Sequence, residues 1–254
     1  MSYLPFRELI LCILFCFSFA AHATPALKAG AYVREGGSGT LILEKNTGGH
    51  LSFSLSAIGV NAHTCSLEGE IRDGKATMKE AWAEGACTVI FAPQAKGIEV
   101  TGKDGETGAC RYYCGMRAYF DGLYEMPPAG CAPAEIEQTR EEFRHFYDAK
   151  KYRDALARLK PVLDNCQTMI HPLYEEGPIR NDLAVTYHKL ADYKACRDVL
   201  EPYAEDAMLK DEEINEYSYA PSDQGTYLSI ISAARVNLRL CNSAEKAAAG
   251  KKKQ

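Results

Sequence analysis

The sequence predicts an α+β protein of two domains, an N-terminal antiparallel β-barrel or sandwich followed by a short αα-repeat domain. Apolar residues recur with period two from about residue 32 to residue 100, which is typical of strands with one buried face. A helical pattern that repeats begins after residue 133, and the Pro-Pro-Ala-Gly turn at 127–130 separates the two patterns. We therefore expect a β domain at 24–132 and a helical repeat domain at 133–241.

The two ends of the chain are predicted to lie outside these domains. An apolar run, Leu9–Ala20, precedes Ala21-His22-Ala23, and this order is typical of a secretory signal peptide at 1–23. The run is shorter than the roughly 20 residues that span a bilayer. We expect a periplasmic or secreted protein with no stable membrane insertion after cleavage, and a disordered basic tail at 242–254.

Strand-like segments alternate with turn sequences in the β domain. Leu51–Ala57 places leucine and phenylalanine on one face and serine on the other, and the NTGG turn at 46–49 precedes it. Further strand segments are 39–45, 66–71, 75–82, 87–93 and 97–102. Five to seven short strands joined by Gly, Asn and Asp turns predict a small barrel or sandwich.

The helical domain contains an internal repeat. Residues 143–161 align with residues 184–202 at an offset of 41, so that aromatic, small and leucine positions coincide and Pro161 falls on Pro202. Such a repeat predicts stacked αα hairpins, and a further helix at 226–241 would cover the open end. Proline in a helix removes a hydrogen bond, so both prolines are expected to kink or end their helices.

The second unit resembles a tetratricopeptide repeat. Its segment LAVTYHKLADYKACRDVL, at 183–200, has the Leu-Ala pair, the two tyrosines, the Lys-Leu turn and the small second-helix residue of that family. The resemblance extends over 134–241, although the units are longer than the family's usual length of about 34 residues. It implies binding of proteins or peptides on a concave face, and no catalysis.

Eight of the ten cysteines lie beyond the predicted signal peptide, and an even number in an exported chain predicts disulfides. They are Cys65, Cys87, Cys110, Cys114, Cys131, Cys166, Cys196 and Cys241. Because an αα hairpin brings the start of its first helix beside the end of its second, we expect a Cys131–Cys166 bond. A Cys196–Cys241 bond would fasten the last helix to the stack.

The four cysteines of the β domain are expected to meet at one end of the sheet. Three pairings remain open: 65–87 with 110–114, 65–110 with 87–114, and 65–114 with 87–110. A redox dithiol formed by Cys110 and Cys114, or a zinc site that includes His63, is the alternative use. The CxxxC spacing fits neither the CxxC redox motif nor paired zinc ligands, so we expect no metal and no cofactor.

Two segments are candidates for binding a partner. The loop at 209–223 places four carboxylates before two tyrosines, a composition that suits a basic partner; these residues are Asp211, Glu212, Glu213, Glu216, Tyr217 and Tyr219. The segment 119–124, YFDGLY, is interpreted mainly as an aromatic plug for the barrel. Asp121 and Tyr124 would alternatively form an exposed binding edge.

Neither catalysis nor nucleic-acid binding is predicted. No GxSxG, HExxH, P-loop or dinucleotide motif occurs, and the formal net charge is −5.

In architecture and in its Asn61-x-His63-x-Cys65 sequence, the β domain loosely resembles small exported barrels that inhibit lysozyme-type enzymes, and immunity proteins against cell-wall hydrolases. This resemblance implies a non-catalytic protein that binds a basic cell-wall hydrolase. An envelope-assembly scaffold that binds peptides through its helices, or an unrecognised hydrolase, are the alternatives.

Overall fold

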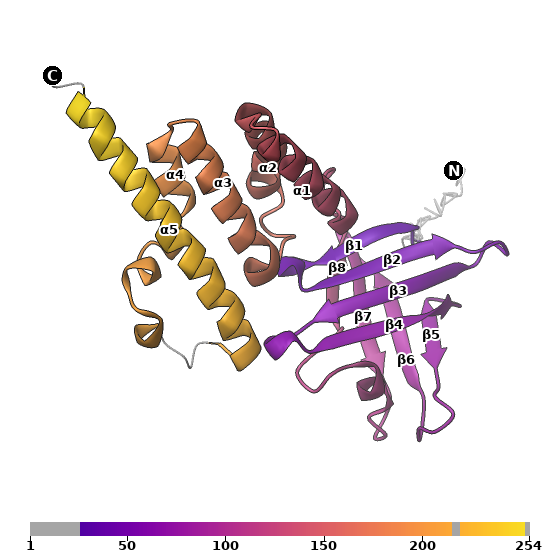
Figure 1. Cartoon of the computed structure of the whole chain (residues 1–254). Coiled ribbons are helices and arrows are strands. Elements are labelled where there is room, and N and C mark those ends of the chain that lie inside the picture. The colour runs from indigo at the N-terminus through magenta and orange to yellow at the C-terminus, as the bar shows by residue number, and fades with distance from the viewer. Residues whose placement is uncertain (1–25, 215–218, 252–254) are drawn as a thin grey trace, which may run out of the picture.

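The computed structural model describes residues 26–214 and 219–251, so the predicted signal peptide lies outside the described residues. Figure 1 shows an antiparallel sheet that is nearly closed into a barrel, followed by a stack of helices. The predicted α+β architecture in two parts is confirmed.

The barrel contains eight strands in the order β4-β3-β2-β1-β8-β7-β6-β5. Every pair of neighbours in this order is hydrogen-bonded and antiparallel. Their bounds are β1 Gly30–Arg34, β2 Gly39–Lys45, β3 Leu51–Ile58, β4 Thr64–Ile71, β5 Lys75–Met78, β6 Cys87–Pro93, β7 Gly97–Lys103 and β8 Gly122–Glu125. Strands β1 and β8 are not among the predicted strand segments, so the sheet has eight strands rather than five to seven. Strand β8 is only four residues long and overlaps the segment 119–124 that is interpreted as an aromatic plug.

The barrel interior is filled by the alternating apolar residues of the strands. Leu41, Leu55 and Phe53 are almost fully buried, and the rings of Phe53 and Phe91 lie 4.9 Å apart. Tyr124 on β8 is completely buried, and its hydroxyl donates a hydrogen bond to the Phe120 carbonyl. The aromatic-plug interpretation is therefore confirmed for the buried half of the 119–124 segment.

Residues 109–114, here called the strap, close the gap between the two edge strands. Strands β4 and β5 end the strand order, and β5 stops at Met78, too early to cover the start of β4. The strap includes the 3-10 turn η3, Ala109–Tyr113, and contacts both β4 and β6. Disulfides fix it on either side, because Cys114 bonds Cys65 and Cys110 bonds Cys87. Covering an edge in this way hides backbone groups that would otherwise pair with another chain.

This pairing is one of the three that the sequence leaves open, and it decides the chemistry of the strap. Cys110 and Cys114 bond to different strands rather than to each other, so they do not form a dithiol pair. All four sulfurs of the β domain are used in disulfides, and none of them can ligate zinc.

The helical part contains α1 Pro133–Asp148, α2 Tyr152–Asn165, α3 Gly177–Lys189, α4 Tyr193–Val199 and α5 Pro221–Lys251. Short turns connect them, among them η4 Pro172–Glu176, η5 Glu201–Tyr203, η6 Asp206–Met208 and η7 Asp211–Glu213. The predicted Cys131–Cys166 and Cys196–Cys241 disulfides are both confirmed. The first joins the start of α1 to the end of α2, and the second joins α4 to α5.

The repeat at an offset of 41 extends to the turns between the helices. Lys150 and Ala191 occupy equivalent positions in the α1–α2 and α3–α4 turns, and both adopt a left-handed backbone, with φ of 59° and 60°. The amides that follow, of Lys151 and Asp192, donate to the carbonyl five residues earlier, at 2.9 and 3.0 Å. The two prolines differ, because α2 continues past Pro161 to Asn165 whereas α4 ends before Pro202.

Helix α5 is longer than the sequence predicts. It starts at Pro221 rather than at residue 226 and continues to Lys251, so the interpretation of the tail as disordered is wrong for residues 242–251. Alanine-rich sequence favours helix, and Arg197 on α4 donates to both carboxylate oxygens of Glu245, at 2.6 and 3.0 Å. Residues 252–254 lie outside the described residues.

The two parts of the molecule are joined where the β3–β4 loop meets the start of α5 (Figure 1). The Asn61 side-chain oxygen accepts from the Ser222 amide at 2.9 Å and so caps α5 from the other domain. In return, the buried Asp223 carboxylate accepts from the Asn61 amide at 2.6 Å and from the Tyr174 hydroxyl at 2.9 Å. A second contact joins the Gly36 amide to the Thr168 carbonyl, at 2.8 Å.

Replacing Asn61 by alanine is expected to lower the free energy of unfolding by about 1–2 kcal/mol, because the helix loses its cap and alanine is strained at a φ of 62°. Asn61→Gly removes the cap without the strain and is expected to lower it by less. Chemical denaturation followed by far-UV circular dichroism measures both. Equal losses for the two variants would show that backbone strain contributes nothing at this position.

Candidate functional site

The predicted acidic interface is folded partly onto the protein itself. The Asp211 carboxylate accepts from Arg235 on α5 at 3.0 Å, and the Glu213 carboxylate accepts from the Lys210 amide at 2.7 Å. Glu212 is exposed, whereas Glu216 and Tyr217 lie outside the described residues. Two of the described carboxylates are therefore already engaged within the chain.

Tyr219, the last residue of that predicted interface, packs inward. Its half-buried ring stacks on Tyr227, with centroids 4.6 Å apart, and Tyr227 donates to the Asp206 carboxylate. Burial raises the pKa of Tyr219, and burial together with the Asp206 carboxylate raises the pKa of Tyr227. Burial also raises the pKa of the nearby Tyr203 to about 12. These tyrosines stay neutral, and they attach the loop to α5.

The second candidate, the binding edge at Asp121 and Tyr124, is wrong for Tyr124. That side chain has no exposed surface, and burial raises its pKa to about 12. Asp121 is exposed, but its carboxylate accepts from the Gly102 amide at 2.7 Å. Arg34 donates to the Tyr119 carbonyl at 2.7 Å and to the Asp121 carbonyl at 3.1 Å. Asp121 therefore helps to fix the segment that precedes β8.

Large apolar side chains are exposed at the end of the barrel that carries the strap. Trp82 in the β5–β6 loop is 72% exposed, Tyr112 in the strap 46%, Met116 78% and Tyr119 61%. We call these four residues the aromatic surface. The rings of Trp82 and Tyr112 lie edge to face with centroids 5.0 Å apart. The Arg111 guanidinium lies 4.9 Å from the centre of the Tyr119 ring, a cation–π distance.

The backbone beneath the aromatic surface is held by covalent and charged groups. The Arg111 guanidinium donates to the carbonyls of Gly115, Met116 and Ala118, at 3.0, 2.6 and 2.8 Å. The Asp104 carboxylate accepts from the Cys110 amide at 2.9 Å, and both strap disulfides lie in the same region. The backbone that carries Tyr112, Met116 and Tyr119 is thus held by a rigid frame, and such frames position binding residues on loops.

The surroundings of the aromatic surface carry charges of both signs. Glu84 and Glu106 are exposed there, as are Lys79 and Arg117. Burial, together with the neighbouring Glu80 carboxylate, raises the pKa of Tyr113 in the strap. Aromatic residues, methionine and arginine are enriched in protein interfaces, and a mixed charged rim is typical of them. The arrangement suits contact with another protein.

Besides the acidic loop at 209–223, the sequence indicated Asp121 and Tyr124 near this surface. It did not indicate Trp82, Tyr112 or Met116, whose side chains are exposed in the structure. Trp82 was assigned to a strand at 75–82, but β5 ends at Met78 and leaves Trp82 in a loop. The feature of the sequence that indicates an exposed Trp82 is its position among charged residues, in KEAWAEG at 79–85.

Among residues 26–214 and 219–251, no group of three potential metal ligands occurs. Within the same ranges, none of the helices combines the length and the apolar character needed to cross a bilayer.

Within residues 26–214 and 219–251, the fold and the site define a disulfide-bonded barrel followed by five α-helices, with exposed aromatic residues at the strapped end of the barrel. Four disulfides point to an oxidising environment, periplasmic or extracellular. Comparison with models of protein families, with curated proteins and with solved structures found no match to this chain.

Proposed function

We propose that this protein is exported after removal of a signal peptide and binds another protein non-covalently through the aromatic surface, without catalysis. The observation that carries the proposal is the exposed Trp82–Tyr112 pair, in which Trp82 of the β5–β6 loop packs on the strap that two disulfides fix, at the end of the barrel where Met116 and Tyr119 are also exposed. Tryptophan and tyrosine are enriched among binding hot spots, and a group of exposed large apolar side chains at one end of a barrel is a candidate interaction site.

The rigidity of the frame supports the same proposal. Ordering a loop at an interface consumes part of the binding free energy, and a loop that is already ordered avoids that loss. The strap is fixed by Cys110, Cys114 and the three hydrogen bonds of Arg111 before any partner arrives. Such a surface suits tight binding to a folded partner.

A basic cell-wall hydrolase is the partner class that we propose, which would make the protein an inhibitor or immunity protein. The net charge of −5 favours encounter with a basic partner, and cell-wall hydrolases act in the oxidising compartment to which the disulfides point. The tetratricopeptide-like helices would then support the barrel rather than form the main contact.

Binding to purified basic cell-wall hydrolases, lysozyme-type enzymes included, tests the proposal. We expect one-to-one binding with loss of hydrolase activity, and we expect Trp82→Ala to weaken it by about 2 kcal/mol or more, roughly 30-fold. Ile42→Ala, which truncates an exposed apolar residue on the outer face of β2, is the matched control and should leave the affinity unchanged. Isothermal titration calorimetry measures both.

Photo-crosslinking separates protein binding in general from the hydrolase proposal. A crosslinking residue at position 82 of the exported protein should capture a partner that the same residue at position 42 does not. Capture at 82 with no binding to any hydrolase would disprove the hydrolase proposal alone. Equal capture at both positions, or none at 82, would disprove protein binding through the aromatic surface.

A further inference from the structure

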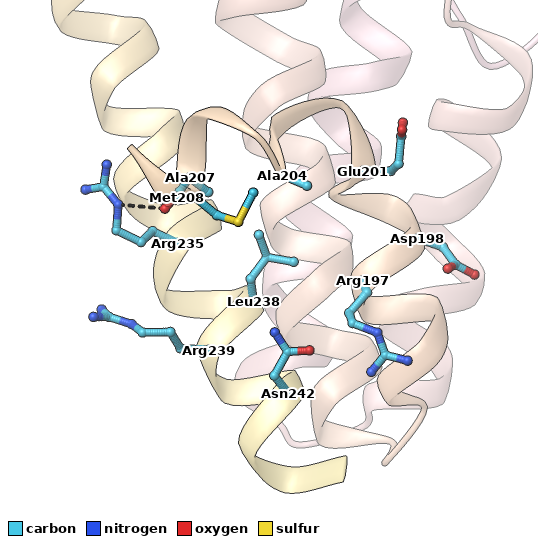
Figure 2. A pocket seen from close by; sticks show the side chains of 10 residues that line it. All are labelled: Arg197, Asp198, Glu201, Ala204, Ala207, Met208, Arg235, Leu238, Arg239 and Asn242. Carbon is cyan, nitrogen blue, oxygen red and sulfur yellow. Dashed lines mark hydrogen bonds between the residues drawn. The ribbon is translucent and has the colours of Figure 1, made fainter. Parts of the chain in front are cut away.

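A second surface, unrelated to the aromatic surface, is a groove between α4, the turns η5 and η6, and α5 (Figure 2). Its volume is about 570 Å³, within the range of about 300–1,000 Å³ that is usual for small-molecule sites. Leu238 on α5 forms the apolar floor with Ala204 and Ala207, and Met208, which is 82% exposed, stands over it.

Two of the three arginines that line the groove have partners within the protein. Arg197 on α4 is paired with both carboxylate oxygens of Glu245. Arg235 on α5 donates to the Ala207 carbonyl at 3.1 Å and to the Leu209 carbonyl at 2.8 Å, besides its bond to the Asp211 carboxylate. These two arginines hold the walls together, and their charges are compensated.

Arg239 differs from both. Its side chain is exposed, and within residues 26–214 and 219–251 its guanidinium makes no hydrogen bond or ion pair. Figure 2 shows it projecting from the same side of α5 as Arg235, with its guanidinium directed away from Leu238 and Asn242. Asn242, three residues further along α5, also lines the groove and adds an amide donor. Acidic groups, Asp198 and Glu201, lie on the opposite wall.

We propose that this groove binds a small amphiphilic anion, such as a medium-chain carboxylate. The anionic head would accept hydrogen bonds from the Arg239 guanidinium, whose exposed side chain would turn toward the groove, and the chain would cover Leu238 and Met208. A free arginine at the edge of an apolar groove fits a ligand that combines one negative charge with a hydrocarbon chain, because each end then meets a complementary surface. The acidic opposite wall disfavours a second negative charge at the far end of the ligand.

Titration of the full protein with decanoate, below the concentration at which micelles form, tests this proposal. We expect saturable binding of one decanoate, at least tenfold tighter than that of decanol or decyltrimethylammonium, which share its chain but lack the negative head. Arg239→Gln should weaken the binding of decanoate about tenfold, because the substitution removes a charge-assisted hydrogen bond worth roughly 1.4 kcal/mol. Met208→Ser should weaken the binding of decanoate and of decanol by the same factor.

Arg153→Gln is the matched control, because Arg153 is an exposed arginine on α2, remote in sequence from the groove. It should leave decanoate binding unchanged, as should Trp82→Ala, so the result is independent of the proposed function. Both groove variants change exposed side chains and should leave the thermal unfolding temperature within a degree or so of the wild type.

Three results would overturn the proposal. They are the absence of saturable decanoate binding, equal affinities for decanoate and its neutral or cationic analogues, and unchanged binding in Arg239→Gln. Binding of an acidic, leucine-containing peptide that depends on Arg239, with none of decanoate, would also overturn it and would assign the groove to peptides.

Discussion

Replacing Cys65 and Cys114 together by alanine is expected to lower the free energy of unfolding of the barrel by about 4 kcal/mol. This bond joins residues 49 apart in sequence, and a crosslink over such a loop restricts the unfolded chain by about that amount. The folded state also loses the attachment of the strap to β4, the edge strand that β5 leaves partly uncovered. Trp82 is the only tryptophan in the sequence, so denaturation followed by its fluorescence reports on the barrel.

The matched variant replaces Cys196 and Cys241, which join α4 to α5 over a separation of 45 residues. It should shift the transition seen by far-UV circular dichroism and leave the transition of Trp82 fluorescence nearly unchanged. A loss below about 1 kcal/mol in the Cys65/Cys114 variant would contradict the role given to the strap.

Tyr124→Ala is expected to lower the free energy of unfolding by about 3–5 kcal/mol, because it empties a completely buried aromatic position. Tyr124→Phe keeps the ring and removes only the hydrogen bond to the Phe120 carbonyl, which is worth about 1 kcal/mol. Thermal and chemical denaturation measure both losses.

Tyr119→Ala provides the comparison, since Tyr119 belongs to the same six-residue segment but is 61% exposed. Its truncation should change stability by less than about 0.5 kcal/mol beyond the cation–π contact with Arg111. If Tyr124→Ala were as mild as Tyr119→Ala, the burial of Tyr124 would be disproved, and the binding edge that the sequence first indicated would return as a candidate.

Much of the fold could be predicted because its determinants are local. The alternation in Leu51–Ala57 and the NTGG turn define a hairpin without knowledge of the rest of the chain. The repeat at 41 residues defines two αα hairpins, and the geometry of a hairpin is enough to join Cys131 to Cys166.

The features that could not be predicted depend on non-local pairing. The choice among three disulfide pairings required the strand order, which puts β8 between β1 and β7 and leaves the strap beside both β4 and β6. The extension of α5 depends on Glu245 meeting Arg197, 48 residues away in sequence.

The candidate site was missed for a related reason. Tyr119 and Tyr124 look equivalent in the sequence, but the backbone places one on the surface and the other in the core. Trp82 appeared to continue a strand, and only the end of β5 at Met78 turns it toward solvent.

The disulfides of the strap also determine the order in which the protein can mature. Cys65 and Cys87 leave the ribosome before Cys110 and Cys114, yet their native partners are the two later cysteines, in nested order. Any Cys65–Cys87 bond formed while the chain oxidises must be broken by thiol–disulfide exchange before the native pairs can form. The helical half has no such requirement, because there each cysteine pairs with the next one along the chain. Only the first half is therefore open to delay by disulfide reshuffling of this kind, which takes seconds to hours depending on the oxidant and the isomerase.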